Sequence, residues 1–359
     1  MPELPDVEVY REALTARIVG ARLLRVDVLN PFLVRTAVPP LDAAMNRRVL
    51  SVRRLGKRIV ITFDGELHFV IHLMIAGRLR WLADDAKPPG RITLAVFHFE
   101  SGRLAFTEAG TKRRASLHVV QGAAAVAGFD MGGLEISGLS FKDFDARLRS
   151  ENHTLKRALT DPRLFSGIGN AYSDEILHRA KLSPLALTSK LDDAQRRRLF
   201  RATVDVLREW TQRLVEQARG DFPDKVTAFR PEMAVHGRYG QPCPVCNAPV
   251  QRIVYAENEC NYCAVCQTGG TLLADRALSR LLHASWPRSR PTACATSSTC
   301  TRAWNTRSTT TAAQRATTRQ RRISRGRARS RSCDRHWAHP PEASAEFVDR
   351  ARPARVQQA

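Results

Sequence analysis

Cys243-Pro244-Val245-Cys246 and Cys263-Ala264-Val265-Cys266 are the stretches that say most about the fold: two Cys-x-x-Cys pairs with sixteen residues between them. Four thiolates at this spacing close a tetrahedral Zn²⁺ site, because each pair supplies two sulfur atoms from one tight turn. Four sulfur ligands leave no open coordination position, so we expect one structural zinc ion on Cys243, Cys246, Cys263 and Cys266. The ion would fix a hairpin from about Val250 to Asn261. The alternative is four unlinked thiols.

The residues before the cysteines have helical periodicity from Phe141 to about Gln217. Asp161-Pro162 and Ser183-Pro184 interrupt the pattern, and Asp192–Gln217 is typical of one long amphipathic helix. We expect a helical domain at 141–234 and a zinc module at 235–286, which closes with a short helix around Leu273–Leu282.

The N-terminal third has a different pattern. Residues 5–19 place apolar side chains three and four apart, which predicts a helix. Short alternating or apolar runs follow, separated by turn signals such as Asp64-Gly65 and Ser101-Gly102, and these predict an antiparallel β-sandwich. The expected strands are Arg22–Val28, Arg48–Val52, Arg58–Phe63, Leu67–Leu73, Arg78–Leu82, Ile92–Phe99 and Arg103–Thr107. The fold class is therefore α+β and multidomain, with a β-sandwich domain at 1–120 and a Gly/Ala-rich linker at 121–140.

The charge is strongly positive, with a net +22 over 359 residues. The segment from Pro287 to Ala359 has sixteen arginines against four acidic residues, which leaves +12 there and +10 in residues 1–286. The body alone is basic, so nucleic acid is the expected partner. The segment 287–359 lacks hydrophobic periodicity and is expected to be disordered, or to come from a shifted reading frame. A basic nucleic-acid-binding arm is the alternative.

The sequence shows neither a long apolar span nor a secretory leader, and we expect a cytoplasmic protein. Eight cysteines in such a compartment argue against a disulfide framework.

Met1-Pro2-Glu3-Leu4-Pro5-Asp6-Val7-Glu8 carries the chemistry. Removal of Met1 would leave Pro2 with a secondary α-amine, and α-amines titrate near pH 8, far below lysine. Attack of this amine on C1′ of a nucleotide gives an iminium ion, which acidifies the C2′ proton and permits elimination. Glu3 is placed to act as general acid or base. Taken alone, however, Pro2 and Glu3 would be read as a helix start.

Together these features resemble the formamidopyrimidine-DNA glycosylase/endonuclease VIII family over residues 2 to about 285, and Leu4 favours the formamidopyrimidine branch. Arg54-Leu55-Gly56-Lys57-Arg58 is similar to the family's strand-turn segment, which implies that Lys57 contacts phosphates and assists catalysis; the alternative is a solvated turn lysine. Gly167-Ile168-Gly169-Asn170-Ala171-Tyr172-Ser173-Asp174-Glu175 is similar to the helix–two-turn–helix signature.

Small residues at the start of this helix would leave backbone N–H groups accessible to a phosphate. The resemblance implies that Asn170 holds the same phosphate and that Lys156 contacts another.

Three stretches depart from the family pattern. Asn258 and Cys260 stand where the zinc hairpin usually has Arg and Thr. Loss of that Arg removes a charge-assisted contact of about 1.5–3 kcal/mol and leaves the second elimination step open. Ile75 stands at the position of the usual wedging Met, and the partner loop has no aromatic residue, although Arg113 and Arg114 beside Lys112 are expected to bind phosphates. The loop Ala218–Ala234 is shorter than in enzymes that enclose 8-oxoguanine.

The resemblance implies a monomeric base-excision enzyme that acts on damaged double-stranded DNA in the cytoplasm of a bacterium, on the nucleoid while it acts. It would be a glycosylase for oxidised bases of the formamidopyrimidine/8-oxoguanine type and a lyase that cleaves the abasic site by β-elimination through a Schiff base on Pro2. A glycosylase for oxidised pyrimidines, or mainly an abasic-site lyase, is the first alternative. A zinc-stabilised protein that binds damaged DNA without catalysis is the second.

Overall fold

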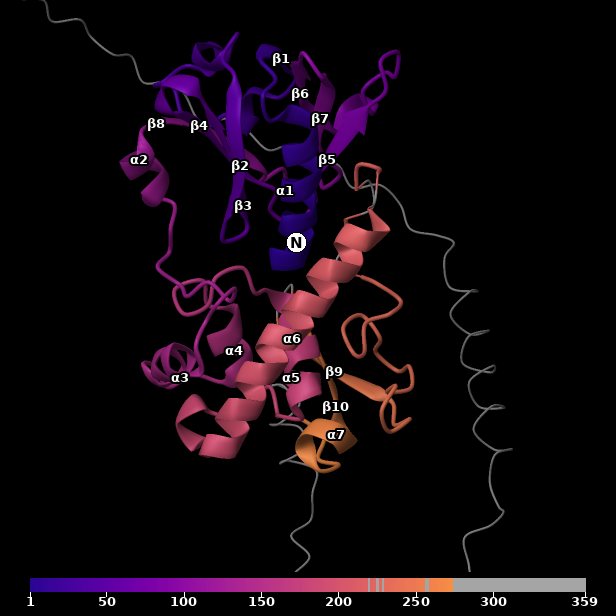
Figure 1. Cartoon of the computed structure of the whole chain (residues 1–359). Helices are drawn as coiled ribbons and strands as arrows, with labels where there is room; N and C mark the ends of the chain where they lie inside the picture. The colour runs from indigo at the N-terminus through magenta and orange to yellow at the C-terminus, as the bar shows by residue number, and fades with distance from the viewer. Residues whose placement is uncertain (219, 224–225, 228, 256–257, 274–359) are drawn as a thin grey trace, which may run out of the picture. The chain divides into compact units, whose positions relative to one another are not determined.

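The computed structural model, drawn in Figure 1, describes residues 1–218, 220–223, 226–227, 229–255 and 258–273. These residues all belong to one compact unit. The expected segment 287–359 and nearly all of the expected helix around Leu273–Leu282 lie outside the described residues. Within them, no helix is both long and apolar enough to cross a bilayer.

Two four-stranded antiparallel sheets form the N-terminal part of the fold, in the orders β1-β6-β7-β5 and β2-β3-β4-β8. Their inner faces carry the apolar residues of each alternating run, and Phe63 and Phe69 meet edge to face with ring centroids 4.7 Å apart. The strands are β1 Leu23–Val28, β2 Val49–Leu55, β3 Arg58–Phe63, β4 Leu67–His72, β5 Gly77–Leu82, β6 Thr93–Phe99, β7 Gly102–Glu108 and β8 Ser116–Gln121.

Helix α1, Leu4–Ile18, connects the sandwich with the helical part of the chain (Figure 1). It packs against β2 and β3 and also against the long helix α6, Asp193–Gln217. Because α1 is covered by both, its residues Val7, Tyr10 and Leu14 are fully buried in a continuous core. This packing brings the start of the chain to the helical domain.

The helical part comprises α3, Phe141–Arg149, α4, Leu155–Thr160, α5, Asn170–Ala180, and α6. Asp161 ends α4, and its carbonyl accepts the N–H groups of Leu164 and Phe165 in the turn that follows. The turns between the end of α4 and residue 170 return the chain to the N-terminus of α5. Asp192 and Gln195 form a capping box that begins α6.

A third, two-stranded sheet pairs β9, Val250–Tyr255, with β10, Asn258–Cys263, and is followed by α7, Ala264–Thr268. The expected α+β architecture is confirmed, including the first helix, the seven expected strands within one to three residues at each end, and the long helix. Strand β8 was not expected, and the segment expected to be an irregular linker contains the short helix α2, Ala123–Ala127.

Candidate active site and nucleic-acid interface

Glu3 joins the start of the chain to helix α5. Its side chain is 2 % exposed, and its carboxylate accepts the backbone N–H groups of Gly169 at 2.7 Å, Ala171 at 2.8 Å and Tyr172 at 3.2 Å. The N–H of Leu4 also donates to the carbonyl of Gly167 at 2.9 Å. Glu3 is therefore fixed by three charge-assisted hydrogen bonds at the positive end of a helix dipole.

This contact corrects one expectation. The N–H groups at the start of α5 were expected to be accessible to a phosphate, but three of them already bind Glu3. The physical reason is that a buried carboxylate meets the same orphan donors that a phosphate would, without an association cost.

Gly169 permits this arrangement because it has no side chain. A Cβ atom there would lie 2.5 Å from Cδ of Glu3 and 2.7 Å from Nζ of Lys57. Its φ of −133° is open to any residue, so the requirement is for space. Glu3 and Lys57, two residues expected to act in catalysis, thus meet at one backbone position.

Burial lowers the pKa of Lys57, and although Glu3 opposes this effect, Lys156 adds to it. Burial also lowers the pKa of the Met1 amine, which the carboxylate of Glu3 opposes and the charge of Arg78 reinforces. An amine at this end of the chain is consequently more often unprotonated, and more nucleophilic, than one in water.

A cavity of about 330 Å³ opens beside these groups. Met1, Lys57 and His72 are among the residues that line it, together with Phe129 and Gly167. Burial and the neighbouring charges of Arg58 and Lys57 lower the pKa of His72 to about 4, so its imidazole is neutral at pH 7. His72 was not among the expected site residues.

Asp6 lies directly behind Glu3 and is fully buried. One of its oxygens accepts the N–H of Glu3 at 3.0 Å, and the other accepts Nη2 of Arg230 at 3.0 Å. Burial raises the pKa of Asp6 to about 6 against the opposing effects of these partners. Arg230 could not be predicted from the sequence, because it lies in an irregular segment and its partner Asp6 is 224 positions away.

Lys156 and Asn170, both expected to contact phosphates, lie together at the start of α5. Nζ of Lys156 donates to the carbonyl of Asn170 and to Oδ1 of Asp174, both at 2.6 Å. Nδ2 of Asn170 donates to the carbonyl of Glu259 on β10 at 2.8 Å. Both side chains thus have protein partners in this structure.

Asp174 and Glu175 attach the cysteine-containing module to α5. Oδ2 of Asp174 accepts Nδ1–H of His236 at 2.8 Å and the N–H of Asn261 at 3.1 Å. Glu175 accepts the backbone N–H groups of Ala234, Val235 and His236. In the sequence, the adjacent acidic residues at the end of the Gly167–Glu175 signature were the feature that could have predicted this contact.

Ile75 and the two arginines lie on neighbouring turns of the sandwich. Gly77 pairs with Glu108, which places the turn containing Ile75 beside the segment 109–115 that carries Arg113 and Arg114. The Ile75 side chain is 56 % exposed. Glu108 accepts the N–H groups of Arg114 and Ala115 and so orders the end of that segment.

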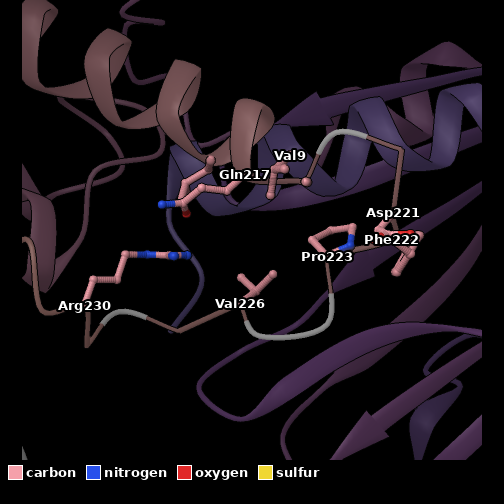
Figure 2. Close-up of a pocket in the computed structure, with 9 residues that line it drawn as sticks. Val9, Gln217, Asp221, Phe222, Pro223, Val226 and Arg230 are labelled. Atoms are coloured by element: carbon pink, nitrogen blue, oxygen red, sulfur yellow. The ribbon is translucent and has the colours of Figure 1, made fainter.

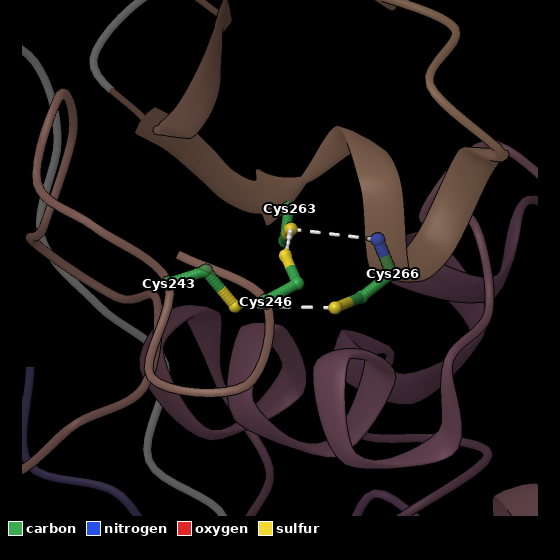
Figure 3. A group of neighbouring side chains, drawn as sticks. All are labelled: Cys243, Cys246, Cys263 and Cys266. Atoms are coloured by element: carbon green, nitrogen blue, oxygen red, sulfur yellow. Dashed lines mark hydrogen bonds between the residues drawn. The ribbon is translucent and has the colours of Figure 1, made fainter. Parts of the chain in front are cut away.

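The four cysteine sulfur atoms converge at the base of the β9–β10 hairpin, as Figure 3 shows. All lie within 4.8 Å of one another, with Cys243 3.9 Å from Cys266 and Cys246 3.3 Å from Cys263. Sulfur ligands about 2.3 Å from a tetrahedral zinc ion would be spaced similarly, so the donor set fits Zn²⁺. Nε2 of His178 lies 3.3 Å from the Cys243 sulfur and belongs to the surroundings of the site.

Comparisons with known proteins agree with this arrangement. The family model of the formamidopyrimidine-DNA glycosylase N-terminal domain matches residues 1–114, and that of the formamidopyrimidine-DNA glycosylase H2TH domain matches residues 136–216. A formamidopyrimidine-DNA glycosylase from Solibacter usitatus is 32% identical over 286 residues, which cover 74% of this chain and 99% of that protein.

Two solved structures are similar over the same region. The MutM (Fpg) protein of Thermus thermophilus matches with a TM-score of 0.64 at 32% identity, covering 76% of this chain and 100% of that one. Lactococcus lactis Fpg in complex with FAPY-dG-containing DNA matches with a TM-score of 0.66 at 25% identity, covering 74% and 100%. The chain belongs to the formamidopyrimidine-DNA glycosylase family.

Proposed function

We propose that this protein is a bifunctional base-excision enzyme, which removes oxidised purines from double-stranded DNA and then cleaves the abasic site by β-elimination. The observation that carries the proposal is the meeting of Glu3 and Lys57 at Gly169, beside a cavity of about 330 Å³ that is also lined by Met1 at the start of the chain. Family membership supports the glycosylase activity. Burial lowers the pKa of the Met1 amine, and Pro2 is itself buried, which supports a Schiff-base mechanism through the amine that removal of Met1 would expose.

The attacking group in this proposal is the amine of Pro2 after removal of Met1. Its lone pair forms a bond to C1′ as the bond from C1′ to the base breaks; the base leaves with the electrons of the broken bond and takes up a proton from water, and the Pro2 nitrogen loses its own proton. Breakage of the C1′–O4′ bond, with a proton delivered to O4′, gives the iminium ion. Loss of the C2′ proton then expels the 3′ phosphate, and water releases the sugar from Pro2.

Glu3 and Lys57 have separate parts in these steps. Glu3 is held beside Pro2 by three N–H donors, and its carboxylate is placed to accept the proton that the Pro2 nitrogen loses and then to deliver it to O4′. The carboxylate of Glu3 favours the charged form of Lys57 against the effect of burial, and we assign this ammonium to the phosphate beside the lesion. The base must leave the helical stack to expose C1′ to an amine at this depth.

We expect the positively charged side chains near Ile75 to bind the DNA duplex. Arg113 and Arg114 beside the exposed Ile75 form the surface that we assign to the duplex, with Ile75 as the wedge and the arginines on phosphates. Lys156 and Asn170 bind phosphate at the start of α5 after exchanging their present partners. We assign one structural Zn²⁺ to Cys243, Cys246, Cys263 and Cys266, where it would hold the hairpin that follows α5.

Two departures favour a narrower activity. Position 258, at the start of β10, is Asn where the family usually has a phosphate-binding Arg, and the wedge region lacks an aromatic partner. These features favour an enzyme that stops after β-elimination or acts mainly on abasic sites or oxidised pyrimidines, and in the extreme a binding protein without catalysis.

A panel of duplexes decides among these functions. Each would carry one 8-oxoguanine, one formamidopyrimidine, one oxidised pyrimidine or one abasic site, with strand cleavage as the measurement. We expect cleavage at the oxidised purines and at the abasic site. Cleavage at the abasic site alone would show that the protein is an abasic-site lyase without glycosylase activity. Cleavage of none of the duplexes would favour a protein that binds damaged DNA without catalysis.

A further inference from the structure

We propose that Arg230 is a positioning residue of this active site: by holding the buried carboxylate of Asp6, it fixes the backbone from which Pro2 and Glu3 project. The inference rests on the proposed function for its chemical consequence and on the contacts of four described residues for its geometry. Arg230 does not touch the reacting atoms in this arrangement and acts through Asp6.

The first step is that Asp6 connects Arg230 to Glu3. The Asp6 side chain is 0 % exposed, and its two oxygens are divided between Arg230 Nη2 and the Glu3 N–H, each at 3.0 Å. The Glu3 carboxylate in turn binds the start of α5. Displacement of Asp6 would therefore release the main chain of Glu3 while its side chain stays attached to α5.

Arg230 lies in the segment that follows α6. The described residues of this segment contact α1 at two places, and Figure 2 shows the side chains of Phe222 and Arg230, one from each place. At one, Phe222 packs on Tyr10, and Nη2 of Arg17 donates to the carbonyl of Gly220 at 3.2 Å. At the other, Arg230 binds Asp6. A cavity of about 250 Å³, lined by Val9, Gln217 and Val226 among others, separates them.

The buried Val226 packs in the core between the two contacts, and Arg230 supplies the hydrogen bond to Asp6 itself. A guanidinium group suits the task, since it stays charged when buried and directs its N–H groups in fixed directions.

The ion pair of Asp6 and Arg230 does not use every hydrogen-bonding group of Arg230. Within the described residues, Nε of Arg230 is buried and has no hydrogen-bond partner. Tyr172 lies in the same electrostatic environment, because Asp6 and Arg230 both act on its pKa. A buried polar atom without a partner costs stability, and a positioning role is one explanation for keeping it.

The experiment compares Arg230→Gln with Arg17→Gln, which removes the other polar attachment of the same segment. One measurement is the single-turnover rate of borohydride-trapped adduct formation with an abasic-site duplex. The second is the Kd for a duplex with a tetrahydrofuran abasic analogue, which cannot form an iminium ion. The third is hydrogen exchange in the peptide spanning residues 2–12.

For Arg230→Gln we expect a trapping rate at least about tenfold lower, as for a misplaced reacting group. We also expect a Kd within about twofold of wild type and faster exchange in residues 2–12. Arg230→Lys should restore part of the rate, and Arg17→Gln should leave the rate and the exchange of residues 2–12 unchanged. If Arg230→Gln and Arg17→Gln behave alike in all three measurements, Arg230 is only a loop attachment and the inference is wrong.

If Arg230→Gln does not fold, the double variant Asp6→Asn/Arg230→Gln is measured instead, because it leaves no buried charge unpaired. Trapping at the wild-type rate by that double variant would overturn the inference, and a slow rate would support it. A wild-type protein that traps nothing would contradict the proposed function instead. The exchange measurement still decides the role of Arg230 in that case, because it requires no activity.

Discussion

The carboxylate of Glu3 lies 2.7 Å from the backbone nitrogen of Gly169, although the two residues are 166 positions apart in the sequence. This contact joins the first residues of the chain to the helix–two-turn–helix domain. It also places a charged side chain, held by helix N–H groups, beside the amine that we propose as the nucleophile.

Gly169→Ala tests the space around this contact. The added Cβ would lie 2.5 Å from Glu3 Cδ, so Glu3 and Lys57 must both move. We expect the rate of base excision to fall by about 100-fold or more, the usual consequence of misplacing a catalytic group by about 1 Å.

Gly128→Ala is the matched control, because its Cβ would meet its nearest neighbour, the Ala125 carbonyl oxygen, at 3.4 Å. That variant should retain the wild-type rate. Equal rates for Gly169→Ala and wild type would show that Glu3 and Lys57 need not lie where the structure puts them.

The pH dependence of stability tests the environment of Asp6, whose pKa rises from an ordinary 3.8 to about 6 on folding. Between these values the folded protein keeps a proton that the unfolded chain has lost, so the cost of burying Asp6 grows as the pH rises. It reaches about 3 kcal/mol above pH 6.

The free energy of unfolding of wild type relative to Asp6→Asn should therefore fall by up to that amount between pH 4 and pH 7. Urea unfolding of both proteins at several pH values measures this difference. A difference that is constant, or that grows with pH, would exclude the raised pKa.

Removal of single cysteines tests the metal site. Cys263→Ser deletes one of four converging sulfur atoms, and we expect the bound zinc to fall from one ion per chain to well below one. We also expect unfolding of the hairpin and weaker binding to an abasic-analogue duplex.

Cys260→Ser is the control, because Cys260 is buried three positions away and lies outside the metal-binding group. It should keep one zinc ion, as measured by elemental analysis of the purified proteins. Full zinc in Cys263→Ser would contradict the assignment of this cysteine as a ligand.

The sequence predicted those parts of the fold that depend on local patterns. Strand Arg58–Phe63 was predicted to the residue because a turn signal and an apolar run bound it, and α6 because Asp192 and Gln195 begin a long amphipathic period. Strand β8 was not predicted, since the basic residues before it obscure the alternation of polar and apolar side chains along it.

The contacts of the site were less accessible to sequence analysis. Both the Glu3–Gly169 and the Asp6–Arg230 pairs join segments more than 150 positions apart, and neither leaves a periodic signal. The occupation of the α5 N-terminus by Glu3 could not be inferred for the same reason, because a free and a capped helix start have the same sequence.

Truncation after Trp286 tests whether the arginines of residues 287–359 contribute to DNA binding. Each phosphate contact adds about 0.9 to the slope of log K against log salt concentration. We expect the slope of the truncated protein to match that of the full chain, since residues 1–286 carry their own net charge of +10. A slope reduced by one or more would assign phosphate contacts to the segment.

The central claim is the attack by Pro2, and borohydride trapping on an abasic-site duplex tests it most directly. Protein whose N-terminus is confirmed as Pro2 should form a covalent adduct, and mass spectrometry of its peptides should place the DNA on Pro2. Adduct on another residue, or none with a folded and zinc-loaded protein that binds the same duplex, would contradict the account.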